Sequence, residues 1–300
     1  MDQRKILISG ASGLIGTAVG TSLAADGCEI SRLVRGKAVR KGDVPWNPAQ
    51  PIAPEKVSGF DVVIHLAGEG VFGVWTREKK RRIHDSRIFG TKNLAEGLAR
   101  AAQKPRVFIS ASAIGYYGDR GDEVLREESS SGAGFLAEVC REWEAATMPA
   151  IDPGIRIVNL RTGHVLSPAG GILKKMLPPF RLGLGGKIGD GKQWQSWIHM
   201  GDWLGALRHI MNNDSLRGPV NLVGPNPVTN GEFTKTLAGV LSRPAFFTVP
   251  GLALKAALGK EAANEMLLSG QRVEPAKLKA SGYQFQFPNL HVALRDLLRK

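Results

Sequence analysis

Residues 5–16 read Lys-Ile-Leu-Ile-Ser-Gly-Ala-Ser-Gly-Leu-Ile-Gly, an apolar run followed by glycines in the spacing Gly-x-x-Gly-x-x-Gly. The apolar run predicts a buried strand, and residues 14–26 predict a helix that begins at the end of the glycine turn. Gly10 would allow the tight turn, Gly13 would let the backbone approach a pyrophosphate, and Gly16 would let the helix pack closely. This order of strand, turn and helix predicts a dinucleotide-binding unit in which the helix N-terminus binds the anion. The expected pyrophosphate contacts are Gly10, Ser12, Gly13, Leu14, Ile15 and Gly16.

The alternation of strand and helix continues beyond this unit. Further strands are expected at residues 29–35, 61–66, 106–110 and 155–160, and further helices at 76–102 and 134–146. Strands that alternate with helices specify a parallel sheet with right-handed connections. Residues 36–59 are polar and contain proline, so we expect a loop with little regular structure there. The predicted fold class is α/β, with a Rossmann-type doubly wound parallel sheet.

The second part of the chain has a looser pattern, and glycine and proline are dense over residues 168–191. The elements expected there are helices at 231–241 and 252–271 and a strand at 219–223 that returns to the main sheet. We predict a nucleotide-binding domain over residues 1–165 and a smaller C-terminal substrate lobe over 166–300, with a cleft between them.

Composition narrows the possible classes of protein. The 300 residues carry a net charge of +13, with 43% hydrophobic and 22% charged residues, as in a globular protein with a basic surface. No apolar run reaches the ~20 residues of a membrane helix, and the first strand begins too early for a signal peptide to precede it. The basic residues are spread along the chain without a nucleic-acid-binding motif. We therefore expect a cytoplasmic monomer or homodimer with a small-molecule substrate, which binds no membrane, nucleic acid or metal.

The end of the second strand bears on the choice of cofactor. Proteins that bind NAD usually place an acidic residue there, which accepts hydrogen bonds from the ribose hydroxyls. This chain has Arg35, a cation suited to a 2′-phosphate, so the sequence predicts NADP. The residues that could assist are Arg32, Lys37 and Arg40. At the end of the third strand, the small residues among Leu66, Ala67 and Gly68 would let the dinucleotide lie against the strand.

The next strand leads into residues 110–118, Ser-Ala-Ser-Ala-Ile-Gly-Tyr-Tyr-Gly. With the glycine spacing, this segment resembles the extended short-chain dehydrogenases/reductases, a superfamily that includes nucleotide-sugar epimerases and reductases. The resemblance implies that Ser112 hydrogen-bonds the reacting carbonyl or hydroxyl group. It also implies a Tyr-x-x-x-Lys pair on the following helix, where the tyrosine is the general acid/base. Residues 134–144 contain neither residue, and the alignment places Leu136 and Cys140 at the two positions.

Segments along the whole chain are similar to an atypical, epimerase-like subgroup of this superfamily, often called NAD-dependent epimerase/dehydratase family proteins. The similar segments include 68–69, 75–76, 85–91, 110–118, 134–144, 161–166 and 195–202. This resemblance implies NADP binding without an agreed substrate. The further residues expected near the cofactor are Glu69, Arg87, Ser110, Ala111, Arg161 and Thr162. The residues that could replace the missing pair in proton transfer are Tyr116, Tyr117 and His164, since the tyrosines lie beside Ser112 and histidine titrates near neutral pH.

These residues favour an NADP-binding, epimerase-like oxidoreductase that acts on a nucleotide sugar or a small carbonyl compound. The alternative is a protein that binds NADP(H), senses its redox state and catalyses nothing, which the loss of the Tyr-Lys pair would explain. Nucleic-acid binding through the basic surface is a weaker third hypothesis, because no recognition motif accompanies the charge.

Overall fold

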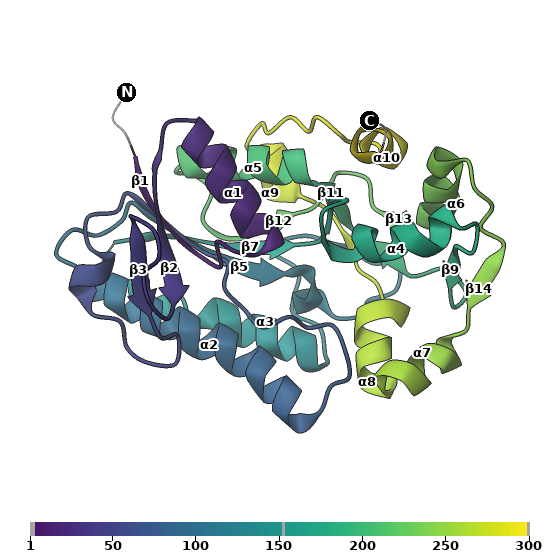
Figure 1. Cartoon of the computed structure of the whole chain (residues 1–300), viewed down its shortest axis with the longest axis horizontal. Coiled ribbons are helices and arrows are strands. Elements are labelled where there is room, and N and C mark those ends of the chain that lie inside the picture. The colour runs from purple at the N-terminus through teal and green to yellow at the C-terminus, as the bar shows by residue number, and fades with distance from the viewer. Residues whose placement is uncertain (1–3, 152–153, 299–300) are drawn as a thin grey trace.

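The computed structural model describes residues 4–151 and 154–298, and its centre is a seven-stranded sheet (Figure 1). The strands, in spatial order, are β12 (Gly218–Leu222), β7 (Arg156–Thr162), β5 (Val107–Ala113), β4 (Val62–His65), β1 (Lys5–Ser9), β2 (Glu29–Arg35) and β3 (Asp43–Trp46). Every neighbouring pair is parallel, so the carboxyl ends of the strands meet at one edge. The predicted doubly wound α/β fold is confirmed, as is the return of residues 219–223 to the sheet.

Helices cover both faces of this sheet (Figure 1). One face is covered by α1 (Leu14–Ala25) and α5 (Met200–Asn212), and the other by α2 (Arg77–Arg100) and α3 (Phe135–Ala145). Successive residues of a strand point to opposite faces. In β1, Ile6 and Ile8 accordingly join the hydrophobic cluster that includes Val19 of α1, whereas Leu7 joins the cluster that includes Leu94 of α2. Burial on both faces explains the unbroken apolar run of β1.

The second part of the chain gives β12 and α5 to the main sheet and its cover, and other segments of it pack together beside the sheet, at the right of Figure 1. Three helices, α4 (Gly171–Arg181), α6 (Asn230–Leu241) and α10 (Leu290–Leu298), share a hydrophobic cluster with Trp197. Its small two-stranded sheets pair β8 (His164–Leu166) with β11 (Trp197–His199), β9 (Gly186–Ile188) with β14 (Phe247–Val249), β10 (Trp194–Gln195) with β13 (Val228–Thr229), and β6 (Val124–Leu125) with β15 (Arg272–Val273). The remaining helices include α9 (Ala276–Ala280) and short 3₁₀ turns at Pro54–Val57, Ile114–Tyr117 and Met148–Ala150.

Two segments have more regular structure than the sequence predicted. Residues 36–59 contain β3, whose register beside β2 is supported by the salt bridge between Arg32 and Asp43, 2.6 Å between nitrogen and oxygen. The glycine- and proline-rich stretch contains α4, although Pro178 and Pro179 lie inside it. Burial of one apolar face of α4 against the lobe outweighs the poor local propensity of proline.

The prediction of one continuous helix over residues 252–271 is wrong. The structure has α7 (Gly251–Leu258), α8 (Lys260–Ala263) and a π-helical turn at Asn264–Leu268. The break lies at Gly259, whose φ of +85° is a left-handed conformation that glycine adopts without steric cost. The break matters for function, because the π-helical turn lies against the N-terminus of α3.

Candidate functional site

The glycine turn forms a close-fitting cradle at the carboxyl edge of the sheet. Gly10 has a φ of +69°, and a Cβ atom there would lie 2.7 Å from the carbonyl carbon of Leu66. A Cβ on Gly16 would overlap the carbonyl oxygen of Gly10. Gly13 is the N-cap of α1, and its N–H donates to the Gly10 carbonyl oxygen at 3.0 Å. Ser12 and Gly13 are exposed, so the free N–H groups of the first turn of α1 can meet an anion.

The ends of β1 and β4 are tied together by a buried hydroxyl. Ser9 Oγ accepts hydrogen bonds from the N–H groups of Leu66 and Ala67 and lies 2.6 Å from His65 Nδ1. These bonds hold Leu66 and Ala67 against the Gly10 turn, where the sequence placed the dinucleotide. Burial lowers the pKa of His65 to about 4, so the ring is neutral at physiological pH.

We expect His65 to make the protein acid-sensitive. Its folded-state pKa of about 4 lies below the ordinary 6.5, so below pH 6.5 the unfolded chain binds a proton that the folded chain does not. Stability should therefore fall as the pH drops from 6.5 towards 4, by up to about 3 kcal/mol from this group. His65→Asn has no titrating ring and can still hydrogen-bond Ser9. Urea unfolding at neutral and mildly acidic pH should show that the variant loses less stability on acidification than the wild type. An equal loss of stability in both proteins would show that His65 is not the source of the acid sensitivity.

Arg35 lies at the end of β2 with an exposed side chain. Its charge is a minor one among those that lower the pKa of Glu69, of which the hydrogen bond from Lys79 is the largest. Two guanidinium nitrogens of Arg32, Nε and Nη2, donate to Asp43 Oδ1, and the other Asp43 oxygen accepts a hydrogen bond from the N–H of Arg40. The expected help from Arg32 therefore has no support in the structure, because its guanidinium already has a carboxylate partner.

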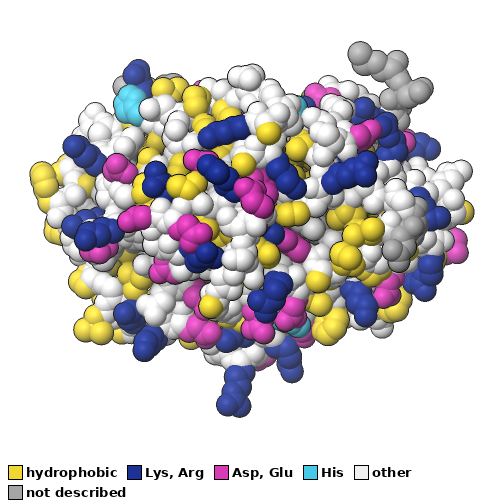
Figure 2. Space-filling model, turned by 180° about the vertical axis from the view of Figure 1, so that it is seen from behind, with side chains coloured by type: hydrophobic (Ala, Val, Ile, Leu, Met, Phe, Trp, Pro, Cys, Tyr) yellow, Lys and Arg dark blue, Asp and Glu magenta, His cyan; other side chains and the backbone are white. Residues whose placement is uncertain are grey.

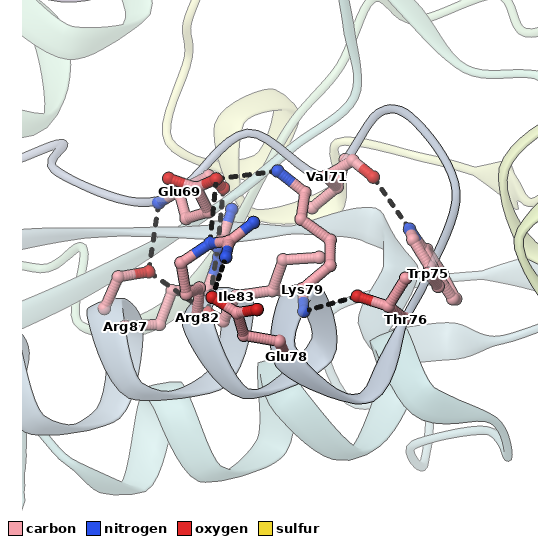
Figure 3. A network of polar contacts seen from close by, with 10 residues as sticks. Glu69, Val71, Trp75, Thr76, Glu78, Lys79, Arg82, Ile83 and Arg87 are labelled. Atoms are coloured by element: carbon pink, nitrogen blue, oxygen red, sulfur yellow. Dashed lines mark hydrogen bonds and ion pairs between the residues drawn. The ribbon is translucent and has the colours of Figure 1, made fainter.

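Glu69 follows β4, and Arg87 of α2 lies beside it, as Figure 3 shows. Lys79 Nζ is 2.7 Å from Glu69 Oε1, and Arg87 Nη1 donates to the carbonyl oxygens of Glu69 and Ile83 at 2.9 and 3.0 Å. The Arg87 guanidinium stacks on Trp143, 4.9 Å from the ring centroid, and would lie 3.3 Å from a Cβ on Gly68. The loop that contains Glu69 is thus held against the end of β4 by two cations of α2, Lys79 and Arg87.

Leu136 and Cys140, which the alignment sets at the tyrosine and lysine positions, lie on α3. A Cβ on Gly115 would lie 3.4 Å from Leu136 Cβ and 3.9 Å from Cys140 Sγ, so both residues face the turn after β5. Burial raises the pKa of Cys140 to about 12, which keeps the thiol neutral. Arg87 is the nearby cation, and its charge partly opposes that rise.

Three of the predicted site residues, Ser112, Tyr117 and Arg161, join a buried polar network instead of lining an open site. Glu144 Oε1 accepts a hydrogen bond from Ser112 Oγ at 2.7 Å, and its two oxygens accept from Arg161 Nε and Nη2 at 2.8 Å each. Arg161 Nη1 donates to the Tyr117 hydroxyl, which donates to Asn221 Oδ1. Tyr116 differs, because its ring lies 3.5 Å from the Arg161 guanidinium and its hydroxyl makes no hydrogen bond within the described residues.

This network weakens two of the catalytic expectations. Ser112 is buried and its hydroxyl proton is held by Glu144, and Tyr117 is fully buried. Burial raises the pKa of Tyr117 to about 12, so it is a poor proton donor near neutral pH. The geometry therefore supports positioning roles for both residues. Sequence reasoning did not single out Glu144, which joins β5, α3 and β7 through these hydrogen bonds.

A cavity of about 240 Å³ opens beside Leu136. Its lining residues are Gly115, Gly118, Asp119, Ala133, Leu136, Asn264, Glu265, Leu268, Ser269 and Gln271. Glu265 accepts hydrogen bonds from the N–H groups of Phe135 and Leu136 at 2.9 and 2.8 Å, and so caps α3 from the C-terminal lobe. Sequence reasoning missed Asp119 and Glu265, because nothing in the local sequence links the π-helical turn to α3.

The other predicted site residues lie on β5, β7 and β8. Ser110 and Ala111 belong to β5, and Thr162 ends β7, where its hydroxyl accepts from Trp203 Nε1 at 3.4 Å. His164 begins β8, and its Nδ1 is buried without a hydrogen-bond partner among the described residues. Burial lowers the pKa of His164, so the ring is neutral near pH 7 and cannot serve there as an imidazolium donor.

Comparison with known proteins agrees with this architecture. The family model described as "NAD dependent epimerase/dehydratase family" matches residues 6–224, and a domain of unknown function (DUF1731) matches residues 249–297. Epimerase family protein Mb2239 of Mycobacterium bovis is 42% identical, over 96% of each chain. The crystal structure of human epimerase family protein SDR39U1 with NADPH has a TM-score of 0.90 and 34% identity, over 98% of each chain.

A second solved structure, a nucleoside-diphosphate sugar epimerase from Corynebacterium glutamicum, has a TM-score of 0.82 and 38% identity, and covers 99% of this chain and 58% of that one. These matches confirm the resemblance predicted from the motifs. The chain belongs to the NAD dependent epimerase/dehydratase family.

Proposed function

We propose that this chain is an NADPH-dependent reductase of a small carbonyl compound that is uncharged or positively charged. The observation that carries the proposal is the juxtaposition of a dinucleotide cradle with a small acidic cavity at the same edge of the sheet. The proposal goes beyond the family assignment in two respects, the cofactor and the substrate, and each rests on its own residues.

The residues present fit NADPH. The space that a Cβ would fill at Gly10 and Gly16 is occupied by backbone, which brings the turn and the helix N-terminus close to an incoming pyrophosphate. Gly10, Ser12, Gly13, Leu14, Ile15 and Gly16 would hold the pyrophosphate, and Leu66, Ala67 and Gly68 the adjoining ribose. Arg35 is an exposed cation suited to the 2′-phosphate, and human SDR39U1 was crystallised with NADPH. When bound, the nicotinamide supplies a hydride to a carbonyl carbon.

Arg35→Ala should lower the affinity for NADPH by about 10- to 100-fold, because a charge-assisted hydrogen bond to phosphate contributes roughly 1.5–3 kcal/mol. NADH affinity should be unchanged, since that cofactor has no 2′-phosphate. The control is Lys104→Ala, which removes one positive charge at an exposed position beyond α2. Fluorescence titrations of the three proteins compare the two cofactors, and equal losses of NADPH and NADH affinity in Arg35→Ala would show that Arg35 serves another purpose.

Arg87 takes over the charge of the missing lysine in this proposal. Its guanidinium packs on Trp143, which lies on the same helix as Cys140, and donates to backbone on α2 and after β4, so it is held rigidly. Tyr116 is the donor that we assign, because its hydroxyl is uncommitted and its neighbours Gly115 and Gly118 line the cavity.

The cavity supports a small carbonyl compound over a nucleotide sugar. Its volume of about 240 Å³ lies below the roughly 300–1,000 Å³ of sites for larger ligands. Asp119 and Glu265 are its charged lining residues, and no lysine or arginine is among them. A diphosphate requires cations or free N–H groups, and Glu265 already occupies those at the start of α3. The remaining lining amides and hydroxyl suit a polar molecule without negative charge.

A panel of carbonyl compounds tests this function through NADPH oxidation. We expect turnover with glyceraldehyde or an amino aldehyde, and none with glyoxylate or a uridine-diphosphate ketosugar. Ala133→Trp should obstruct the mouth of the cavity and raise KM for the active compound about tenfold or more without changing NADPH affinity. Ala49→Trp, at an exposed position on the loop after β3, is the matched control. Turnover of the ketosugar alone would contradict the proposal, and tight NADPH binding with no turnover of any compound would favour the redox sensor.

A further inference from the structure

An exposed apolar surface lies at the far end of the C-terminal lobe. Its large side chains come from two segments, residues 171–189 and 242–260, which the pairing of β9 with β14 brings together. Phe246 is 89% exposed, Leu252 80% and Leu182 74%. The other exposed members are Leu184, Phe247 and Val249. Clustered exposure of this kind marks an interaction surface, whereas single exposed apolar residues need no explanation.

The same two segments are uniformly basic. They contain Lys174, Lys175, Arg181, Lys187, Arg243, Lys255 and Lys260, and neither segment contains an aspartate or glutamate. The acidic residues that directly follow the two segments are Asp190 and Glu261. Asp190 Oδ1 accepts a hydrogen bond from the N–H of Lys192 at 3.0 Å, and Glu261 pairs with Lys80 at 2.8 Å. We call the surface formed by residues 171–189 and 242–260 the basic apolar face. Yellow and dark-blue side chains, with magenta ones among them, lie along the left edge of Figure 2, the side to which β14 and α7 turn in that view.

Leu173, Leu177 and Phe180 of α4 belong to the core of the lobe, but the apolar side chains of α7 do not. α7 has the sequence Gly-Leu-Ala-Leu-Lys-Ala-Ala-Leu, yet none of its residues is buried. Phe246 and Phe247 border a hollow of about 400 Å³ whose rim includes Lys187, Lys235 and Arg243. Apolar side chains surrounded by cations are typical of proteins that lie on a membrane surface, where the apolar groups enter the acyl boundary and the cations meet lipid phosphates.

We propose that the basic apolar face docks the protein onto an anionic lipid surface. A second copy of the chain is a poorer occupant, because a twofold interface brings the same patch of both subunits together and would oppose like charges. Nucleic acid would satisfy the cations but not the aliphatic side chains of Leu182, Leu184 and Leu252. None of the helices in the described ranges is long and apolar enough to cross a membrane, so the contact is peripheral.

Vesicle co-sedimentation of the full chain tests the proposal. We expect binding to vesicles of phosphatidylcholine with phosphatidylglycerol, weak binding to phosphatidylcholine alone, and loss of binding as salt rises. The double variant Phe246→Ser/Leu252→Ser should bind at least tenfold more weakly. The double variant Lys187→Ala/Arg243→Ala should lose about fivefold per charge. The control is Val39→Ser, which removes an 86% exposed valine from the loop after β2. Unchanged NADPH affinity shows that each variant is folded.

Three results would overturn this inference. The first is absence of binding to the anionic vesicles by wild-type protein that binds NADPH. The second is a dimer in solution, seen by light scattering, that Phe246→Ser/Leu252→Ser converts to monomer. The third is salt-sensitive binding of RNA or DNA that the same variant weakens while vesicle binding stays absent. The inference does not depend on the proposed substrate, since vesicle binding is measured without turnover.

Discussion

Glu144→Ala should lower the free energy of unfolding by about 3–5 kcal/mol, the usual cost of leaving a buried charge without its partner. Arg161 is 3% exposed at its side chain, and both Glu144 oxygens accept its hydrogen bonds. Without the carboxylate, the guanidinium would keep the Tyr117 hydroxyl and the Glu127 carbonyl oxygen as partners, both uncharged. Ser112 would lose its acceptor as well. Urea unfolding of the two proteins measures the difference.

Two further variants distinguish the effect of the unpaired buried charge on stability from the effect of changing a side chain on α3. Arg161→Met/Glu144→Leu removes both charges and replaces them with apolar side chains, so it should be less destabilised than Glu144→Ala alone. Glu138→Ala removes a carboxylate from an exposed position of the same helix and should change stability by about 0.5 kcal/mol or less. If Glu144→Ala lowers the free energy of unfolding no more than Glu138→Ala does, the buried network does not stabilise the fold as its geometry indicates.

Gly16→Ala should reduce NADPH affinity about 100-fold or more. The added Cβ would overlap the carbonyl oxygen of Gly10 and approach the Ala11 backbone, so the turn and the helix must move apart. Such a movement withdraws the N–H groups that bind the pyrophosphate, and loss of two charge-assisted hydrogen bonds costs about 3–6 kcal/mol. Isothermal titration with NADPH measures the loss.

Gly20→Ala is the matched control, because it lies on the same helix and a Cβ there would meet nothing within 4 Å. Alanine is a better helix former than glycine, so this variant should gain about 0.5–1 kcal/mol of stability and keep its NADPH affinity. Equal affinity of Gly16→Ala and the wild type would mean that the glycine turn does not form the cofactor site.

Features encoded by neighbouring residues could be predicted from the sequence. The glycine turn, the position of Arg35 at the end of β2 and the placement of Leu136 and Cys140 on α3 each follow from local spacing on one strand or helix. Burial on both faces gives the strands of the sheet continuous apolar runs, which is why their order along the chain was clear.

Features that join distant segments could not be predicted in the same way. Tyr117 bonds Asn221 across the fold, and Glu265 reaches α3 only because Gly259 breaks the helix before it. α4 forms in a proline-containing segment because tertiary burial outweighs propensity. The basic apolar face arises from the pairing of β9 with β14, and the expectation of no membrane partner rested on the absence of a long apolar run, which cannot detect a surface of this kind.

A fluorescence titration of the wild-type protein with NADPH and NADH measures whether this chain binds NADPH through the glycine cradle and Arg35. We expect saturable NADPH binding that is at least about tenfold tighter than NADH binding, since the 2′-phosphate adds a charge-assisted contact. Equal affinity for the two cofactors, or tighter binding of NADH, would contradict the role of Arg35. Absence of binding by either cofactor would mean that the glycine cradle is not a dinucleotide site.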